Sequence, residues 1–306
     1  MEVTFWGVRG SYPVPGPDTV RYGGHTSCVE VRSASGQCVV IDAGTGLRAL
    51  GKKLSKEQRL KGHSKHHIVL SHVHWDHIQG LPFFEPAYIE DTEIHIYGLR
   101  QATEELRQVV GGITRQEFFP VPLEAVPANF SFNEVAAGSG FEIGDLKVTP
   151  FHLNHPFGCV GYKVADGQSS VAYVADTAPF DRMLHKQHFL AGPESPSEED
   201  KKALHKMRED LRTAIRGTHT VIYDTHFSVE EYEKFPHYGH STPEHALEIV
   251  ADLDVSRLVL YHHSPTHDDD TMDKIETLYQ ERGAKKDIQV IAARELMALR
   301  IGGETP

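Results

Sequence analysis

Short apolar runs, separated by glycine, proline and serine, dominate the first 70 residues. The runs at 3–8, 27–31, 38–41 and 67–70 have the length and the β-branched content of buried strands. Residues 10–25 read GSYPVPGPDTVRYGGH and contain too much proline and glycine for regular structure. We therefore expect a sheet at the start of the chain, with a long ordered loop that can line a site.

The apolar pattern continues to the C-terminus, where strands alternate with helices. Further strands are predicted at 93–96, 141–151, 160–164, 170–174, 220–223, 257–261 and 288–291. A helix is predicted over 242–250, because Thr242 can cap it and Pro243 suits its first turn. Another helix is expected to follow 268–270 and to run to Gly283.

The whole chain, residues 1–306, is expected to form one α/β domain. Its length allows about 70–75% of the unfolded surface to be buried, and no linker rich in glycine and serine divides it. The segment at about 181–216 is the one candidate for a helical insertion. Its charged run from Glu198 predicts a solvated helix that packs on the sheet by one face.

Charge and cysteine content narrow the function classes. The chain has 31 Lys and Arg against 43 Asp and Glu, a formal net charge of −12, without a basic stripe. A long nucleic acid is therefore not an expected partner. Cys28, Cys38 and Cys159 follow no disulfide pattern, so we expect buried free thiols and a reducing compartment. The N-terminus lacks signal-peptide features and no run approaches about 18 apolar residues, which predicts a cytoplasmic protein without a membrane partner.

The most informative segment follows the strand at 67–70. It reads SHVHWDH at 71–77 and places three imidazoles and a carboxylate together, the ligand types that suit zinc, manganese or iron. The alternative is a polar loop rich in histidine, because the chain carries 21 histidines, including His63, His66 and His67, which we expect to be solvated. The fixed order HxHxDH at a strand end favours a metal-binding turn.

This HxHxDH segment resembles the first metal motif of the metallo-β-lactamase-fold hydrolases. Three later strand ends match the remaining motifs of that family in order, namely His155 before Gly161-Tyr162, Asp176 before Thr177, and His262 after Leu260-Tyr261. The resemblance covers most of the chain. It implies the αββα sandwich of that family, in which two mixed β-sheets pack face to face with helices outside.

The resemblance also implies two divalent metal ions, zinc or manganese, with iron as a further option. One metal would be held by His72, His74, His155 and Asp176, and the other by Asp76, His77, Asp176 and His262. His152 stays open as an alternative to His155, and His263 as an alternative to His262. Otherwise these two histidines are candidates to support the ligands from behind. Asp42, in the segment IDAGTG, resembles the family's Asp-x-Gly turn, which supports the ligand loop.

A second motif points to one branch of the family. Residues 238–243 read YGHSTP, directly before the predicted helix, and resemble the His-Ser-Thr motif of the ribonuclease Z and cyclic-nucleotide phosphodiesterase branch. An imidazole beside a helix N-terminus can give a proton to a phosphate ester, while the helix dipole favours the anion. His240 would then protonate the leaving alkoxide, and Asp224 would orient the His240 ring. His226 is the alternative to His240 as the proton donor.

Spacing within this branch favours a small substrate. Ribonuclease Z proteins carry a tRNA-gripping arm between the third-motif histidine and the bridging aspartate, but only 21 positions separate His155 from Asp176 here. We therefore expect a small phosphodiester, a 3′,5′-cyclic nucleotide, to be hydrolysed by a hydroxide that bridges the two metals. Asp76 and His240 would be catalytic.

The opening loop also resembles bacterial cyclic-nucleotide phosphodiesterase-like proteins. We expect Arg9, Arg21 and His25 to contact the anion, although His25 stands where that group has asparagine. The resemblance further implies a homodimer. The alternatives are a ribonuclease Z-like RNA endonuclease, a thioester or lactone hydrolase with the same metals, and a non-catalytic metal or nucleotide sensor.

Overall fold

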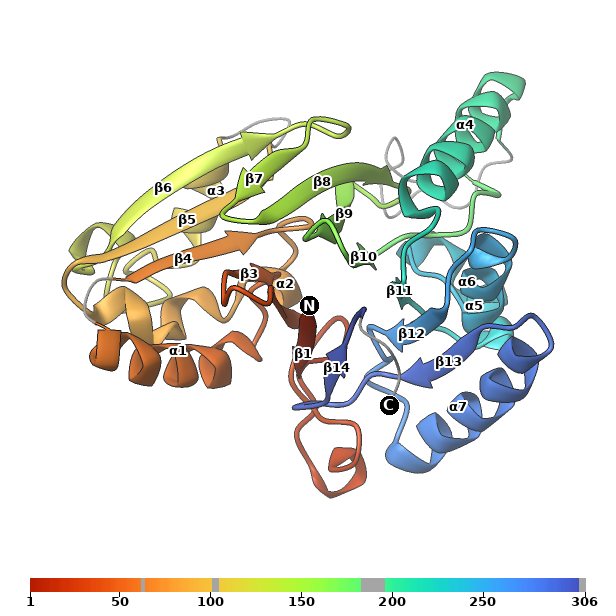
Figure 1. The fold of residues 1–306 in the computed structure, drawn as a ribbon, viewed down its shortest axis with the longest axis horizontal. Helices are drawn as coiled ribbons and strands as arrows, with labels where there is room; N and C mark the ends of the chain where they lie inside the picture. Colours follow the sequence, from red (N-terminus) through yellow and green to blue (C-terminus); the bar gives the residue numbers. More distant parts are fainter. Residues whose placement is uncertain (62–63, 101–104, 183–195, 303–306) are drawn as a thin grey trace. The chain divides into compact units, whose positions relative to one another are not determined.

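The computed structural model describes residues 1–61, 64–100, 105–182 and 196–302 (Figure 1). Their contacts divide the chain into two compact units. The N-terminal unit comprises residues 2–135 and 294–299, and the C-terminal unit comprises Met1, residues 136–293 and the chain from Arg300. The second unit thus includes the candidate insertion, in which residues 183–195 lie outside the described part of the chain.

The N-terminal unit is built on a mixed sheet. The order of its described strands is β14 (Ala298–Arg300), β1 (Glu2–Gly7), β2 (Cys28–Arg32), β3 (Cys38–Ile41), β4 (Ser64–Val69), β5 (Thr92–Leu99) and β6 (Asn129–Val135). From β1 to β3 the strands pair antiparallel, and from β3 to β6 they pair parallel. This unit also contains the helices α1 (Leu47–Lys61), α2 (Trp75–Ile78) and α3 (Leu106–Gly112).

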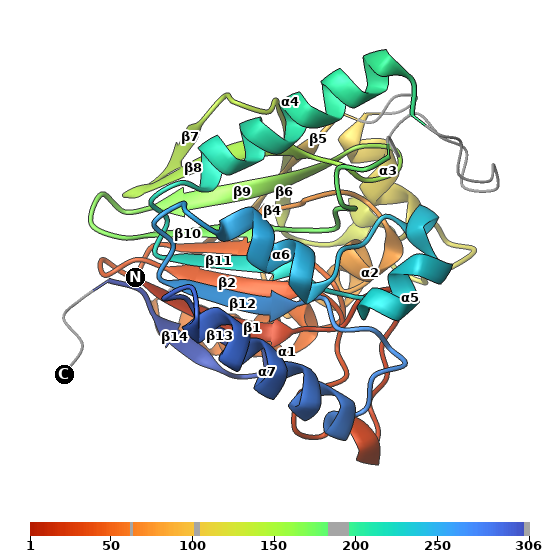
Figure 2. The same ribbon diagram turned by 90° about the vertical axis from the view of Figure 1, so that its right-hand side faces the viewer.

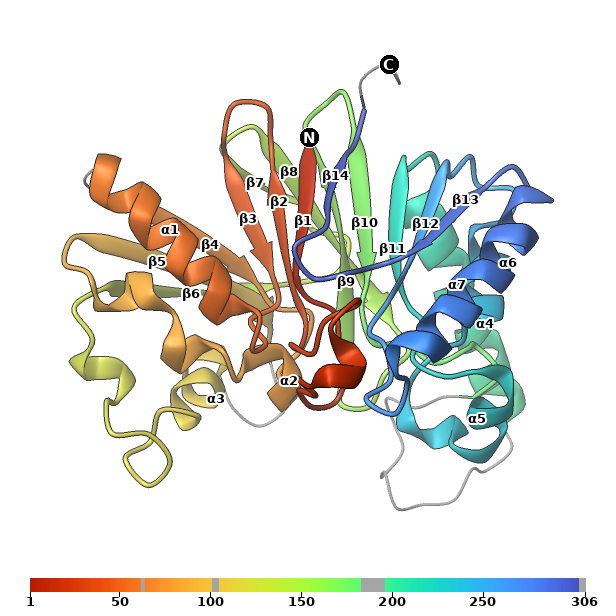
Figure 3. The ribbon, with the colours of Figure 1, turned by 90° about the horizontal axis from the view of Figure 1, so that it is seen from below.

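Helix α1 covers one face of this sheet (Figure 3). Its apolar residues Leu47, Leu50 and Leu54 pack with Ile68 of β4 and Ile96 of β5 in one buried cluster. The leucines recur at helical spacing, and buried and partly exposed positions alternate along β5, where Ile96 lies on the buried face. This packing fixes the end of β4, from which the HxHxDH segment leaves.

The C-terminal unit contains the second mixed sheet. The order of its described strands is β13 (Gln289–Ala292), β12 (Arg257–Tyr261), β11 (Thr220–Asp224), β10 (Ser170–Val174), β9 (Cys159–Ala165), β8 (Leu146–Leu153) and β7 (Phe141–Ile143). From β7 to β10 the pairing is antiparallel, and from β10 to β13 it is parallel. The helices α4 (Glu198–Ile215), α6 (Pro243–Val250) and α7 (Asp269–Ala284) pack against strands of this sheet (Figure 2).

The parallel half of each sheet explains where the polar residues gather. The carboxyl ends of adjacent parallel strands meet at one edge of a sheet. In the N-terminal unit, Asp42 and Ser71 leave the adjacent strands β3 and β4 at this edge. In the C-terminal unit, Asp176, Asp224 and His262 lie at the ends of β10, β11 and β12. Each unit therefore concentrates ionisable side chains at one edge of its own sheet.

Most predicted elements are present, and the exceptions have local causes. The helices expected at 242–250 and after 268 are α6 and α7. The charged run from Glu198 is α4, which packs against β8 and buries Leu204, Leu211 and Ile215. The prediction of a single strand at 141–151 is wrong. This segment forms the hairpin β7–β8, because a turn at Gly144, with φ 58°, interrupts the run.

The prediction that His66 is solvated is also wrong. Its ring is buried against Phe84 at a centroid distance of 5.5 Å, and burial lowers its pKa to about 4. His67 is half-buried, and His63 lies outside the described residues. The three cysteines are free, with Cys28 and Cys159 buried. Among the residues with described positions, no helix is long and apolar enough to cross a membrane.

Candidate metal centre

Asp42 organises the HxHxDH segment of the N-terminal unit. Its backbone adopts φ 60°, a left-handed conformation that aspartate tolerates better than most residues. One carboxylate oxygen accepts a hydrogen bond from the Ser71 amide at 2.7 Å, and the other accepts one from the Ser71 hydroxyl at 2.8 Å. The second oxygen also lies 2.7 Å from Nδ1 of His77. Asp42 therefore ties the ends of β3 and β4 to the start of α2, as the Asp-x-Gly resemblance implied.

These contacts determine the tautomers of two histidines. A carboxylate can only accept, so Nδ1 of His77 carries the proton and Nε2 keeps its lone pair. The Ser71 hydroxyl donates to Asp42 and can therefore accept from Nδ1 of His72, 3.0 Å away. Both imidazoles thus present an Nε2 lone pair. The ring of His72 lies 4.2 Å from that of His77 and 4.5 Å from that of His74, between centroids.

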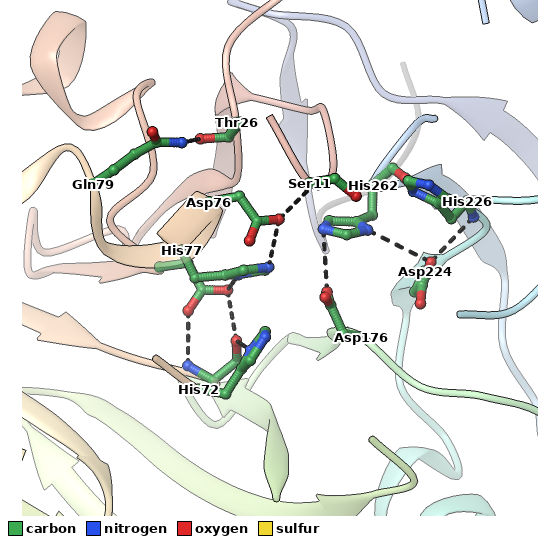
Figure 4. Close-up of polar contacts among 12 residues, drawn as sticks. Ser11, Thr26, His72, Asp76, His77, Gln79, Asp176, Asp224, His226 and His262 are labelled. Carbon is green, nitrogen blue, oxygen red and sulfur yellow. Dashed lines mark hydrogen bonds and ion pairs between the residues drawn. The ribbon is translucent and has the colours of Figure 1, made fainter. Parts of the chain in front are cut away.

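The carboxylate of Asp76 is buried beside these rings. One of its oxygens lies 3.3 Å from Nε2 of His77 and accepts a hydrogen bond from the Ser11 backbone amide at 2.7 Å (Figure 4). The start of the opening loop therefore contacts the HxHxDH segment within this unit. Sequence reasoning did not find the Ser11 contact, because a backbone amide leaves no side-chain signal.

A second cluster forms at the strand ends of the C-terminal unit. Oδ1 of Asp176 lies 3.2 Å from Nε2 of His262, and Oδ2 lies 3.9 Å from Nε2 of His155 (Figure 4 shows the first pair). Nδ1 of His155 donates to the Gly239 carbonyl at 2.9 Å, which leaves Nε2 as the atom that faces Asp176. All three side chains are buried.

The structure distinguishes the two pairs of neighbouring histidines that the sequence left open. His155 lies in the Asp176 cluster, whereas His152 is exposed on β8. His262, at φ 61°, turns its ring toward Asp176, whereas Nε2 of His263 lies 2.8 Å from the Ala293 carbonyl. The left-handed backbone of His262 is unfavourable for most residues other than glycine, and such a conformation persists only where the surrounding structure holds it.

Asp224 connects the remaining histidines of this unit. Its Oδ2 lies 3.0 Å from Nδ1 of His240 and accepts from the Thr177 amide at 3.1 Å. Its Oδ1 accepts from the His226 amide at 3.1 Å and lies 3.8 Å from Nδ1 of His262. The predicted Asp224–His240 pair is thus present in the fold, with the imidazole proton held on Nδ1.

His226 lies in the same cluster and differs from His240 in its partners. Its ring stacks on that of His240 at 4.5 Å, and its Nδ1 donates to the His262 carbonyl at 3.0 Å. Burial lowers the pKa of His226 well below 6.5, and the nearby His240 and His262 lower it further. A neutral His226 bonded to a carbonyl is a poor proton donor, which favours His240 for that role.

The donor set of both clusters fits a divalent metal ion. The buried donors are imidazole nitrogens and carboxylate oxygens, which suit zinc, manganese and iron. Within the C-terminal unit alone, one ligand atom from each of Asp176, Asp224, His240 and His262 lies within 4.8 Å of the others. In both units, carboxylates and carbonyls orient the imidazoles from behind, as they do around metal ligands.

The three predicted anion contacts have different environments in the N-terminal unit. Arg9 is fully buried, and its Nε donates to the Gly23 carbonyl at 2.7 Å. The Gly23 contact gives Arg9 a role in holding the opening loop, and its contact with an anion stays a prediction. Arg21 is exposed on the same loop. His25 is partly exposed, and its Nδ1 lies 3.2 Å from the Thr45 hydroxyl.

Residues 37–190, half of the chain, match the beta-lactamase superfamily domain. The chain belongs to the beta-lactamase superfamily. Ribonuclease Z from Methanopyrus kandleri is 25% identical to it over 279 residues, which cover 87% of this chain and 88% of the relative. This superfamily protein therefore lies on the ribonuclease Z and phosphodiesterase branch, as the His-Ser-Thr motif predicted.

Solved structures support the fold class of this superfamily protein. The metallo-β-lactamase fold protein YhfI from Bacillus subtilis has a TM-score of 0.66 at 17% identity, with 98% of this chain and 99% of that chain covered. Unliganded yeast PDE1 has a TM-score of 0.61 at 14% identity, with coverages of 98% and 99%. Together with the two mixed sheets, these similarities confirm the predicted metallo-β-lactamase fold.

Proposed function

We propose that this protein is a dinuclear-metal phosphodiesterase whose substrate is a small phosphodiester, a 3′,5′-cyclic nucleotide. The observation that carries the proposal is the Asp224–His240 pair in the C-terminal unit. It places an oriented imidazole directly before α6, next to buried carboxylate and imidazole donors. A thioester hydrolase has no need of such a proton donor, because a thiolate leaves without protonation.

The metal ligands follow the family resemblance. One ion would be held by His72, His74, His155 and Asp176, and the other by Asp76, His77, Asp176 and His262. Zinc, manganese or iron bound by these donors would supply Lewis-acid activation of water and of the phosphoryl oxygens. The chain's own part is to hold each donor in one tautomer, which Asp42 does for His77 and the Gly239 carbonyl does for His155.

His240 has the geometry of a general acid. Nδ1 donates to Asp224, so the protonated ring offers its second proton at Nε2. The carboxylate stabilises the imidazolium form and keeps the ring from turning. His240 can then give that proton to the ribose oxygen as the P–O bond breaks. The N-terminus of α6, capped by Thr242, favours negative charge in the same region.

The strands between His155 and Asp176 support a small substrate. Those positions are occupied by β9 and β10, which pair antiparallel within the C-terminal sheet. They leave no chain for a tRNA-gripping arm. The net charge of −12 also disfavours a polyanion, whose binding requires Lys and Arg to displace counterions. The similarity to ribonuclease Z makes an RNA endonuclease the second candidate.

Product analysis separates these functions. The protein loaded with manganese or zinc is incubated with cyclic AMP, cyclic GMP, a cyclic dinucleotide and a precursor tRNA, alongside the Asp176→Ala variant. Cleavage of a cyclic mononucleotide that disappears in the variant is the expected result. Cleavage of the tRNA alone would establish the endonuclease, and no cleavage of any diester would overturn the proposal.

A further inference from the structure

A row of aromatic rings runs outward from His240 in the C-terminal unit. The ring of Phe227 meets that of His240 edge to face at 5.8 Å between centroids. Phe227 in turn lies 6.1 Å from Phe235 and 6.2 Å from Tyr238, and the last two rings are 5.3 Å apart. These separations are those of interacting aromatic pairs. The row links the proposed proton donor to the surface.

The two outer rings are exposed in spite of this packing. Phe227 is 6% exposed, whereas Phe235 and Tyr238 are each 40% exposed. Contiguous apolar surface that stays exposed can mark a binding site, whereas single exposed apolar residues need no explanation. Folding stability alone does not require this arrangement, because the outer rings keep much of their area in water.

The backbone holds Tyr238 at a fixed position relative to the proposed acid and to a proposed metal ligand. Tyr238 ends the short 3₁₀ helix η5 (Pro236–Tyr238), and Gly239 follows at φ 90°. The Gly239 carbonyl accepts from Nδ1 of His155, and a Cβ placed on Gly239 would lie 2.5 Å from that nitrogen. Only glycine permits this close approach. The Tyr238 backbone is thus separated from His155 by a single glycine.

We propose that Phe235 and Tyr238 form a stacking platform for the nucleobase of the substrate. This inference rests on the proposed function and names the part of the substrate that determines recognition. Every nucleobase presents a flat π-face, and aromatic side chains bind such faces by stacking. The platform would hold the base while His240, two residues from Tyr238, meets the ribose oxygen.

Charge near the platform favours a substrate with one phosphate. Helix α5 (Val229–Lys234), which leads into Phe235, carries Glu230 and Glu233 at exposed positions against Lys234. The negative charge of this helix next to the platform would disfavour a second phosphate close to it. A cyclic mononucleotide therefore fits the platform better than a cyclic dinucleotide or an RNA strand.

The first test compares two diesters that differ only in the base. The kcat and KM of the metal-loaded protein are measured with cyclic AMP and with ribose 3′,5′-cyclic phosphate, which lacks a base. For Tyr238→Ala and Phe235→Ala we expect the KM for cyclic AMP to rise about tenfold with little change in kcat, and the KM for the abasic diester to stay unchanged. Tyr238→Phe should restore the KM, because stacking needs the ring and not the hydroxyl.

Phe118→Ala is the control, because it removes a 68% exposed phenylalanine ring that is neither a proposed metal ligand nor part of the aromatic row. Its kinetics should equal those of the wild type. If Tyr238→Ala raises the KM for both diesters equally, or for neither, the platform is overturned and the phosphodiesterase stands. An unchanged melting temperature separates lost stacking from lost folding.

A binding measurement makes the platform testable without turnover. Calorimetric titration with 5′-AMP and with ribose 5-phosphate should show preference for the nucleotide in the wild type and in Phe118→Ala, and lose it in Tyr238→Ala. If no diester is cleaved but this preference is present and depends on Tyr238, the proposed function fails while base stacking is supported. Equal affinity for both ligands in the wild type would overturn the platform.

Discussion

Nδ1 of His77 lies 2.7 Å from Oδ2 of Asp42, and both side chains are fully buried. The two residues are separated by 35 positions, and the contact joins the end of β3 to the first turn of α2. It fixes the His77 ring in the tautomer that leaves Nε2 able to bind a metal. The same carboxylate also holds Ser71, so one residue positions most of the HxHxDH segment.

Asp42→Asn tests this positioning role. Asparagine tolerates the φ of 60° at this position, so the backbone should be retained. Asparagine has one acceptor oxygen, so it can accept either from the Ser71 amide or from the Ser71 hydroxyl and His77, but not from all three. We expect metal affinity to fall about 10–100-fold, measured by competition with a chelator. Asp91→Asn is the control, because Asp91 has φ 58° and is exposed. Equal affinities in both variants would contradict the role of Asp42.

His240→Gln tests the proton donor through the leaving group. Without the imidazolium, departure of a ribose alkoxide should slow by about 10²–10⁴-fold in kcat. Departure of p-nitrophenolate from thymidine 5′-p-nitrophenyl phosphate needs little protonation and should change much less. Asp224→Asn should show the same selectivity in weaker form, because it removes only the orienting carboxylate. His219→Gln, at an exposed position, is the control. An equal loss with both substrates would rule out acid catalysis by His240.

The sequence could predict the site because its residues leave strands that become neighbours. Asp176, Asp224 and His262 each end an apolar run, and parallel pairing of β10, β11 and β12 brings those ends together. Thr242 and Pro243 predicted the start of α6, because a threonine cap and a proline in the first turn are local helix signals. These signals lie within a few residues of the feature that they predict.

Other features depend on contacts that carry no local signal. The Ser11 amide that meets Asp76 and the Gly239 carbonyl that meets His155 are backbone groups, which every residue has. The bond from Nε of Arg9 to the Gly23 carbonyl, 14 positions away, is likewise not visible in the sequence. The aromatic row was equally hidden, because Phe227 and Tyr238 meet only after the intervening chain has folded back.

Thr242→Ala tests how far α6 depends on its cap. The Thr242 hydroxyl accepts from the His245 amide at 3.2 Å, which satisfies one of the amides at the helix start. Its loss should lower the free energy of unfolding by ~1 kcal/mol, measured by urea denaturation. Thr242→Ser keeps the hydroxyl and should stay close to the wild type. If serine and alanine destabilise equally, the lost methyl group and not the cap is responsible.

Glu231 gives the fold a pH dependence that can be measured. Its carboxylate lies 2.9 Å from Nε2 of His267, and this hydrogen bond is the main reason that the pKa of Glu231 is lowered to about 2. A lowered carboxyl pKa stabilises the fold above the unfolded value of about 4.3, and this stabilisation is lost as pH falls toward 2. The melting temperature of Glu231→Gln should therefore lie below that of the wild type at pH 5–7. The difference in melting temperature should shrink between about pH 4.3 and pH 2, because Glu231 becomes protonated over this range. Glutamine is the suitable substitution, because its side-chain oxygen can still accept from the Ser228 amide as Glu231 does. A difference that stays constant over this range would show that packing, and not the charge on Glu231, accounts for the effect.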